Sequence, residues 1–226
     1  MAAGPAAAQP RHGVEALREV RVDIVSDPIC PWCFIAKRRL ARAAAGLPAD
    51  TRLSVRWVPF ELNPDMPAQG MDRVAYRTAK FGSWERARAR DAEVAAIGAQ
   101  EGIDFRHERM TRTPNTFDAH RLIWLAEREG VQGAMLELLF SAYFVEGRDI
   151  GDAAVLAELA DAVGLGRPMA ETFLAGREGA AEVRAAEAEA RRHGVAAVPT
   201  FLIDGRPAFS GAQRSEVILE HLLHAG

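Results

Sequence analysis

The feature that most constrains this chain is the run Cys30-Pro31-Trp32-Cys33, which holds the only two cysteines among the 226 residues. Residues 20–25, which precede it, show the alternation of a strand, and residues 31–45 show the periodicity of a helix. A dithiol at the start of a helix that follows a strand is typical of disulfide-exchange sites. We therefore expect the two cysteines to carry the chemistry of this protein.

The spacing of the cysteines predicts different roles for them. Residues three apart in the first turn of a helix are neighbours, within reach of a disulfide. We expect Cys30 at the N-cap, where unpaired backbone N–H groups and the positive end of the helix dipole favour a thiolate. Pro31 suits the first helical position because it has no N–H group to leave unpaired. Cys33 is then the deeper, resolving thiol. Trp32 is predicted either to offer an aromatic surface to a substrate or to cover the disulfide.

A zinc site and an inert buried pair are the alternatives to redox chemistry at these cysteines. Zinc takes four ligands, usually a second cysteine pair or paired histidines. The pair His221 and His224 falls just short of the usual histidine spacing. We therefore predict no metal.

Composition excludes several classes of partner. The chain has 28 Lys and Arg against 31 Asp and Glu, a net charge of −3, so it has no basic field for nucleic acid. No apolar run approaches the ~18 residues of a membrane-spanning helix, and the N-terminal residues do not resemble a secretory signal. We predict a cytoplasmic protein with neither a nucleic-acid nor a membrane partner, and a flexible tail over residues 1–19. In a reducing cytosol a lone cysteine pair is more often catalytic than structural.

Two segments with strand character enclose a long helical one. Residues 20–64 predict the order β-α-β, with the second strand at 53–58. Residues 191–226 predict β-β-α, with a hairpin turn at Asp204-Gly205. The residues between them, 65–190, have helical periodicity and glycines at the expected junctions. Helices are predicted at 72–81, 84–100, 115–129, 131–144, 152–163, 167–175 and 178–193.

Four segments resemble the DsbA family of thioredoxin-fold oxidoreductases, especially its FrnE-like cytoplasmic members. These segments are Asp27–Lys37, Asn115–Leu122, Val198–Phe201 and Ser210–Gln213. The resemblance implies an α/β, thioredoxin-like fold formed by residues 20–64 and 191–226, with residues 65–190 as a large all-helical insertion domain. Related 2-hydroxychromene-2-carboxylate isomerases and kappa-class glutathione transferases carry serine where Cys30 stands. Cysteine at both positions favours redox chemistry here.

The resemblance also implies the second half of a site. In such folds a cis proline at the position of Pro199 faces the dithiol helix, and the backbone of the preceding residue, Val198, pairs with an incoming chain. A trans proline that opens a strand is the alternative. Asn115 and His120 open a helix that the resemblance places over the site, where His120 is a candidate to stabilise a thiolate or move a proton. A helix cap and a packed histidine are the alternative for these two residues.

The predicted function is that of a protein disulfide oxidoreductase that works through a mixed disulfide. Cys30 and Cys33 are the predicted catalytic residues. The predicted substrate-binding residues are Pro31, Trp32, Val198, Pro199, Asn115 and His120. No cofactor is required; glutathione is a candidate redox partner, the substrate is a protein or small-molecule thiol or disulfide, and a homodimer is a candidate assembly. The alternatives are a glutathione-dependent isomerase or transferase acting on an aromatic or polyketide-like substrate, and a chaperone-like or metal-binding module without enzyme activity.

Overall fold

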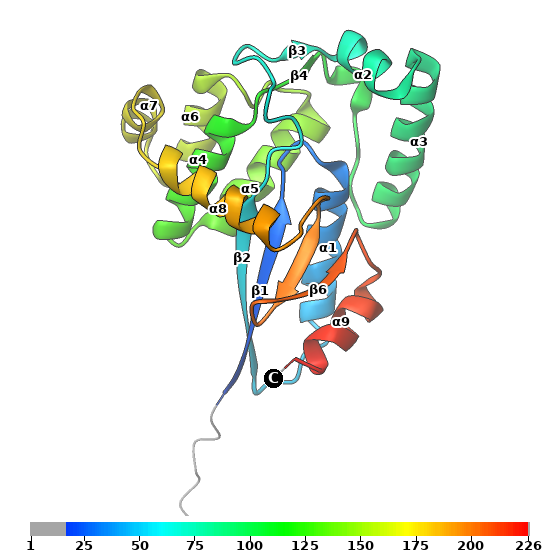
Figure 1. The fold of residues 1–226 in the computed structure, drawn as a ribbon, viewed down its shortest axis with the longest axis vertical. Helices are drawn as coiled ribbons and strands as arrows, with labels where there is room; N and C mark the ends of the chain where they lie inside the picture. The colour runs from blue at the N-terminus through cyan, green and yellow to red at the C-terminus, as the bar shows by residue number, and fades with distance from the viewer. Residues whose placement is uncertain (1–16, 226) are drawn as a thin grey trace, which may run out of the picture.

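The computed structural model describes residues 17–225, and their centre is a four-stranded sheet in the order β2-β1-β5-β6 (Figure 1). The strands are β1 (Arg18–Ser26), β2 (Thr51–Pro59), β5 (Thr200–Ile203) and β6 (Arg206–Ser210). β1 pairs in parallel with β2 and antiparallel with β5, and β5 pairs antiparallel with β6. The crossover helix α1 (Pro31–Ala44) and the C-terminal helix α9 (Ser215–Leu223) complete the β-α-β and β-β-α halves. The predicted fold class is confirmed.

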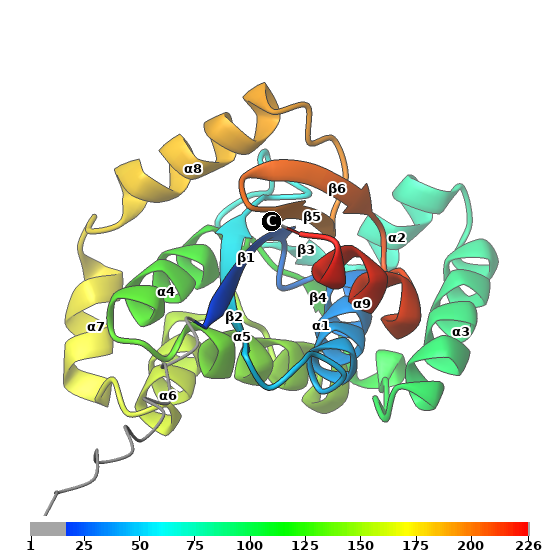
Figure 2. The same ribbon diagram turned by 90° about the horizontal axis from the view of Figure 1, so that it is seen from below.

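The alternation of β1 explains how the sheet is covered. Val20, Val22 and Ile24 are buried in one apolar cluster with α1, whereas Val25 belongs to a second cluster on the opposite face. Helix α1 and helix α9 pack together on the first face, and α8 (Ala180–Arg192) crosses the second face (Figures 1 and 2). The end of β1 therefore has an apolar cluster on each face of the sheet, and this packing holds the turn into α1 in place.

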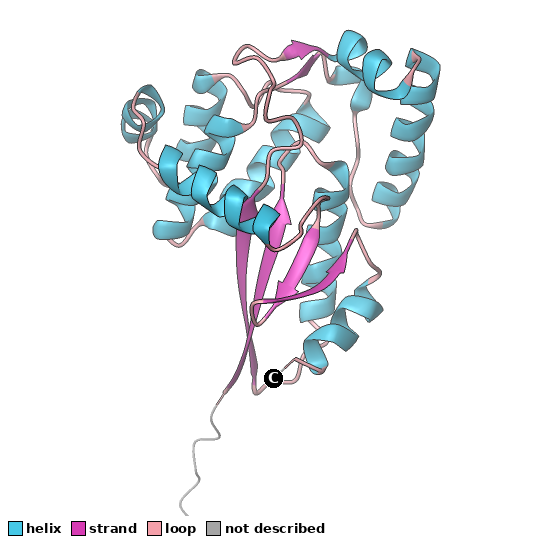
Figure 3. Ribbon diagram, viewed as in Figure 1, coloured by secondary structure: helices cyan, strands magenta, loops and turns pink. Residues whose placement is uncertain are grey.

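The remaining helices fall into two groups on either side of α1 (Figure 2). The first group is the hairpin of α2 (Arg73–Phe81) and α3 (Trp84–Gln100). The second group comprises α4 (Phe117–Arg128), α5 (Gln132–Ser141), α6 (Ala153–Ala162) and α7 (Arg167–Ala175). In Figure 3 these two groups of helices gather around one end of the main sheet, while α9 lies beside its other end.

The segment predicted to be all-helical contains three features that are not α-helix. A short ladder pairs β3 (Met71–Asp72) with β4 (Arg112–Thr113), residues His107–Arg109 form a 3-10 turn, and residues Ala142–Glu146 form a π-helix after α5. A strand of two residues is too short to show alternation, and a π-turn keeps the apolar composition of the helix before it. The periodicity therefore predicted one helix over 131–144 and no strand.

The two helix groups share their core with α1. The Phe34 ring stacks on Phe140 with the ring centroids 4.9 Å apart and meets Phe105 edge-on at 6.0 Å. Basic residues further along α1 form ion pairs with both groups: Arg39 Nε lies 2.7 Å from a Glu101 oxygen, and Lys37 Nζ lies 2.7 Å from one of Glu137. These contacts hold α1 against its neighbours from both sides.

The tail predicted for residues 1–19 lies mostly outside the described residues, and β1 begins at Arg18. Among residues 17–225, no helix combines the length and the apolar character needed to cross a bilayer. The same residues contain no cluster of three or more His, Cys, Asp or Glu side chains arranged to hold a metal ion.

Candidate active site

The turn between β1 and α1 places Cys30 at the helix N-cap. Its backbone is extended (φ −91°, ψ 112°), its side chain forms no capping hydrogen bond, and Pro31 takes the first helical position. The Cys30 amide donates to the Asp27 carbonyl at 2.9 Å, and the Cys33 amide donates to the Cys30 carbonyl at 3.0 Å. The thiol therefore lies where unpaired amides and the helix dipole favour an anion.

The two cysteines are free and differ in their surroundings. Cys33 is fully buried, whereas Cys30 is 4% exposed and lines a cavity. Burial, with a further contribution from the adjacent Cys30 sulfur, raises the pKa of Cys33 well above its usual value. Hydrogen bonds from Ser26 and Asp27 oppose this rise without reversing it. Cys33 is consequently held as a thiol behind the more accessible Cys30.

The loop before β5 lies next to Cys30, although the two segments are far apart in the sequence. The Val198–Pro199 peptide bond is cis. Cys30 Sγ donates to the Val198 carbonyl at 3.6 Å. The Pro199 carbonyl accepts from the Gly211 amide at 2.8 Å, which ties this loop to the end of β6. Pairing of β5 with β1 thus brings residue 198 to the start of α1.

A cavity of about 410 Å³ opens beside Cys30. Of the residues predicted from the sequence, Pro31, Trp32 and Val198 line it with Cys30, whereas Pro199 is not among the lining residues. Trp32 is 37% exposed, so its indole presents an apolar face to solvent. The opposite wall comes from α2 and α3. The start of α1 therefore faces a concave cavity that is partly open to solvent.

Asn115 and His120 do not line this cavity. Asn115 Nδ2 donates to the Met66 carbonyl at 2.7 Å, and its Oδ1 accepts from the Phe117 amide at 2.9 Å, so this side chain fixes the loop before α4. His120 is buried on α4, where burial lowers its pKa to about 3. Its Nε2 lies 3.8 Å from Asp27 Oδ1. A neutral imidazole forms no ion pair with that carboxyl group.

Asp27 is a site residue that the sequence analysis treated only as part of a turn. Its side chain is fully buried and accepts hydrogen bonds from the amides of Leu62 at 2.7 Å and Ile29 at 3.2 Å. Burial nevertheless raises the pKa of Asp27 to about 7. Burial, followed by the charges of Glu187 and Asp27, raises the pKa of Glu61 to about 7 as well. A group of buried acids thus lies behind the dithiol.

A sequence profile of the DSBA-like thioredoxin domain matches residues 21–223. The chain belongs to the DSBA-like thioredoxin family. The resemblance inferred from the four sequence segments is thereby confirmed. Among solved structures, the chain is similar to a probable DsbA oxidoreductase, SCO1869, from Streptomyces coelicolor, with 36% identity and a TM-score of 0.82. That match covers 90% of this chain and 88% of the other.

Two further matches are informative about this DSBA-like chain. It is 27% identical over 203 residues to the uncharacterized protein YwbO of Bacillus subtilis (strain 168), covering 88% of this chain and 93% of YwbO. It is also 27% identical to the cytosolic disulfide reductase DsbM from Pseudomonas aeruginosa, with a TM-score of 0.59 and coverage of 83% and 87%. The family is therefore one of thioredoxin-fold oxidoreductases.

The DSBA-like fold separates the residues predicted for the site into two groups. The cysteines, Pro31, Trp32 and Val198 meet at the start of α1. Neither Asn115 nor His120 lines the cavity: His120 lies next to the buried Asp27, and Asn115 donates to the Met66 carbonyl. The signal that could have identified Asp27 is its place between a buried strand and the dithiol, since a carboxyl group there has little access to water.

Proposed function

We propose that this DSBA-like chain is a thiol–disulfide oxidoreductase whose Cys30 forms a mixed disulfide with the substrate. The asymmetry of the two cysteines carries this proposal. Cys30 stands at a helix N-cap beside a cavity, and the raised pKa of Cys33 keeps the second sulfur protonated. Ordered exchange requires one thiolate and one thiol. The thiolate attacks the substrate disulfide first, and the thiol reacts only in the second step.

In the reducing direction, the Cys30 thiolate attacks a substrate disulfide and releases one substrate thiolate. The mixed disulfide that results joins Cys30 to the other half of the substrate. Cys33 then loses its proton and attacks the Cys30 sulfur, which releases the second substrate thiol and leaves a Cys30–Cys33 disulfide. Two electrons pass from the dithiol to the substrate, and the reverse sequence oxidises a substrate dithiol.

The loop at Val198 is the proposed support for the substrate. In its thiol form Cys30 Sγ donates to the Val198 carbonyl at 3.6 Å, so a substrate bonded to that sulfur lies beside the loop backbone. Backbone groups of Val198 can pair with a peptide substrate as an additional strand would. Trp32 and Pro31 then contact the substrate from the side of α1.

The proposed cycle uses no cofactor, and glutathione is proposed as the thiol that returns the dithiol to its starting state. We also propose that residues 20–64 and 191–226 carry the reaction, while residues 65–190 wall the cavity. The reduction potential sets the direction of exchange. A value near −270 mV in a glutathione buffer marks a reductant, and a value near −120 mV marks an oxidant.

The cysteine variants test the mechanism. Cys30→Ser removes the attacking sulfur and is expected to abolish the reduction of insulin by dithiothreitol that the protein catalyses. Cys33→Ser keeps the first step and blocks the second, so mixed disulfides at Cys30 are expected to accumulate and to be visible by mass spectrometry. Full activity of Cys30→Ser would show that this mechanism is wrong.

A further inference from the structure

The wall of the cavity opposite Cys30 is rich in positive charge. Helices α2 and α3 contribute four guanidinium or ammonium groups to the lining and only two carboxylates. The cations are Arg73, Arg77, Lys80 and Arg90, and the anions are Asp91 and Glu93. Arg90 and Glu93 form an ion pair at 3.1 Å in exposed positions. The more buried cations, Arg73 and Arg77, share the remaining carboxylate, which is that of Asp91.

Asp91 is the partner of two arginines at once. Arg73 Nη2 lies 2.8 Å from Asp91 Oδ2, and Arg77 Nη2 contacts Asp91 Oδ1. These ion pairs tie α2 to α3, which is a structural role. One carboxylate does not neutralise two guanidinium groups, however. Burial, and then the charge of Arg73, lower the pKa of Arg77 despite the opposing effect of Asp91.

Three buried nitrogen atoms among the lining residues have no hydrogen-bond partner within the described chain. They are Arg73 Nη1, Arg77 Nε and Asn63 Nδ2. The Arg73 side chain is only 4% exposed, so bulk water does not compensate it. Asn63 is oriented by Tyr76, whose hydroxyl donates to Asn63 Oδ1 at 2.5 Å. All three groups are donors, and buried donors without acceptors are costly. A ligand that satisfies these three donors must supply hydrogen-bond acceptors, and an anion is the most favourable acceptor beside two guanidinium groups.

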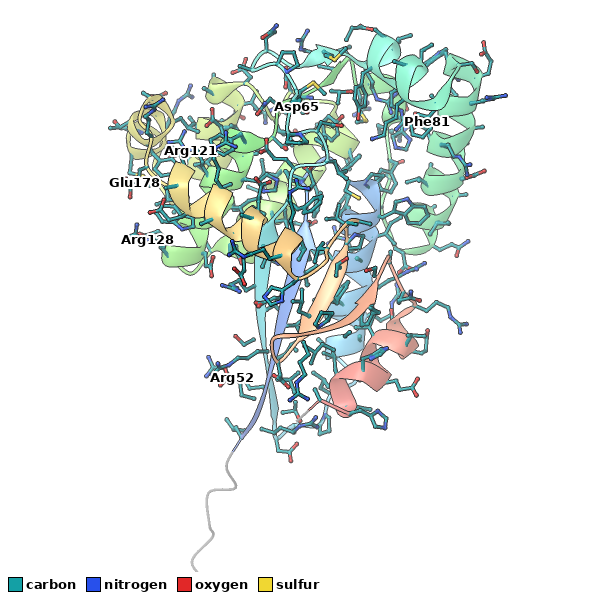
Figure 4. The ribbon with its side chains drawn as sticks, viewed as in Figure 1. Arg52, Asp65, Phe81, Arg121, Arg128 and Glu178 are labelled. Carbon is teal, nitrogen blue, oxygen red and sulfur yellow. The ribbon has the colours of Figure 1, made fainter. Side chains whose placement is uncertain are left out.

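We propose that this wall binds a carboxylate of the substrate, so that the dithiol acts on small acidic disulfides. The inference rests on the proposed function and adds the class of substrate to it. A planar carboxylate matches the fork of a guanidinium group and accepts several N–H groups at once. The aromatic rings of Tyr76 and Phe81 line the same cavity; Phe81 is labelled at the end of α2 in Figure 4. A volume of about 410 Å³ suits a low-molecular-weight ligand.

The exchange itself balances as it does for any disulfide. The reduced dithiol gives two electrons to R–S–S–R, in which R carries a carboxylate. Two R–SH molecules leave, and the Cys30–Cys33 disulfide forms. The arginines take no part in bond making; they hold one R group so that its disulfide lies next to Cys30.

The test compares three probes of similar length and different charge. They are 3,3′-dithiodipropionate, bis(2-hydroxyethyl) disulfide and cystamine, which are anionic, neutral and cationic. Each is mixed with the fully reduced protein, and the rate of loss of the two thiols is followed by mass spectrometry. Each rate is divided by the rate of the same probe with 2-mercaptoethanol, which removes differences in intrinsic reactivity. We expect the anionic probe to be favoured over the neutral one by roughly tenfold, as for one charge-assisted hydrogen bond.

Substitutions in the cavity wall test which residues cause the preference for the anionic probe. Arg77→Gln is expected to remove most of this preference. Lys80→Gln is expected to reduce it, and Lys80 is exposed, so the substitution does not endanger folding. Asp91→Asn is expected to increase it, because the cavity then becomes more positive. Arg86→Gln is the matched control: Arg86 is an exposed arginine of the same hairpin that does not line the cavity. It is expected to leave the preference unchanged.

The outcomes separate this inference from the proposed function. Oxidation of the dithiol by the neutral probe with no preference for the anionic one would overturn the inference and leave the proposed function standing. An equal loss of preference in Arg86→Gln and Arg77→Gln would attribute it to overall charge and would also overturn the inference. If none of the probes oxidised the Cys30–Cys33 pair, the proposed function would fail, and the substrate class with it.

Discussion

At the scale of single residues, the chemistry of this protein depends on how water is excluded behind Cys30. Cys33, Asp27 and His120 are all buried, and for each of them burial favours the neutral form. The more accessible sulfur thus stands in front of groups whose charged forms are disfavoured by burial. This arrangement has a cost in stability that depends on pH.

Asp27→Asn measures that cost. The pKa of Asp27 rises from 3.8 to about 7 on folding, so the unfolded chain loses this proton first as the pH rises. The native protein therefore loses stability between pH ~4 and ~7, by up to roughly 4 kcal/mol. Asparagine does not titrate. The variant is expected to gain stability relative to wild type as the pH rises through this window, as followed by urea unfolding at several pH values.

The informative quantity is the difference in unfolding free energy between wild type and Asp27→Asn at each pH. The difference is needed because titration of His120 changes the stability of both proteins with pH in the direction opposite to Asp27. The pKa of His120 falls to about 3 on folding, so it lowers the stability as the pH drops below ~6.5 in both proteins. Asparagine also forgoes one of the two acceptor oxygens that bind Leu62 and Ile29, which shifts the variant's stability by a constant amount. A difference that does not change with pH would contradict the raised pKa of Asp27.

The residues that could be predicted from the sequence are those whose type is rare and whose chemistry is narrow. Two cysteines with two residues between them, Cys30 and Cys33, are informative because the chain has no others. Arg73 and Arg77 carried no such signal, since they are two of many arginines and most arginines are solvated. Only the packing of α2 against α3 distinguishes them, by burying their guanidinium groups beside one carboxylate.

At the scale of elements, Arg121 organises the end of α7. Its guanidinium group is buried and donates to the carbonyls of Phe173 at 2.9 Å, Gly176 at 3.0 Å and Glu178 at 2.9 Å. Phe173 lies in the last turn of α7, where its carbonyl also accepts from the Gly176 amide at 3.1 Å, whereas Gly176 and Glu178 follow that turn. Arg121 lies in one of the segments that carried the family resemblance, and its contacts give that segment a structural role.

Arg121→Ala is expected to destabilise the protein by roughly 2–4 kcal/mol, because several buried carbonyls lose their donor. Arg128→Ala is the control on the same helix. Arg128 is largely exposed and forms an ion pair with Glu178 at 3.4 Å, so its loss is expected to cost less than about 1 kcal/mol. Figure 4 labels Arg121, Arg128 and Glu178. Equal effects of the two substitutions in chemical unfolding would contradict this role.

Most elements could be predicted because their patterns are long. The periodicity located α3 at 84–100 and α7 at 167–175 as the structure has them. Shorter features depend on tertiary contacts. The β3–β4 ladder forms because the chain returns to the start of α2, where the Arg73 amide donates to the Thr111 carbonyl at 2.9 Å. No local pattern contains that information.

At the scale of the whole molecule, the sheet and the helices share one core. A single buried cluster extends from Val22 and Ile24 of β1 through Phe34 to Leu139 and Phe140 of α5. The aromatic contact of Phe34 with Phe140 crosses the boundary between the thioredoxin-like part and the insertion. Independent unfolding of either part would expose this surface.

Thermal unfolding is therefore expected to occur in one transition. Calorimetry is expected to give a ratio of calorimetric to van't Hoff enthalpy near one. Loss of helical circular dichroism and exposure of Cys33 to a thiol reagent are expected at the same temperature. Two separated transitions would mean that the insertion folds by itself, contrary to the shared core.

The order of strands has a consequence for the protein during its synthesis. β1 lies between β2, which the ribosome delivers soon afterwards, and β5, which it delivers only after the whole insertion. Contacts between such distant segments form late. Until β5 arrives, the nascent chain carries both sulfurs without the Val198 loop beside them. A growing chain is therefore most open to unwanted cross-linking before its last thirty or so residues emerge, and a reducing environment protects it in that interval.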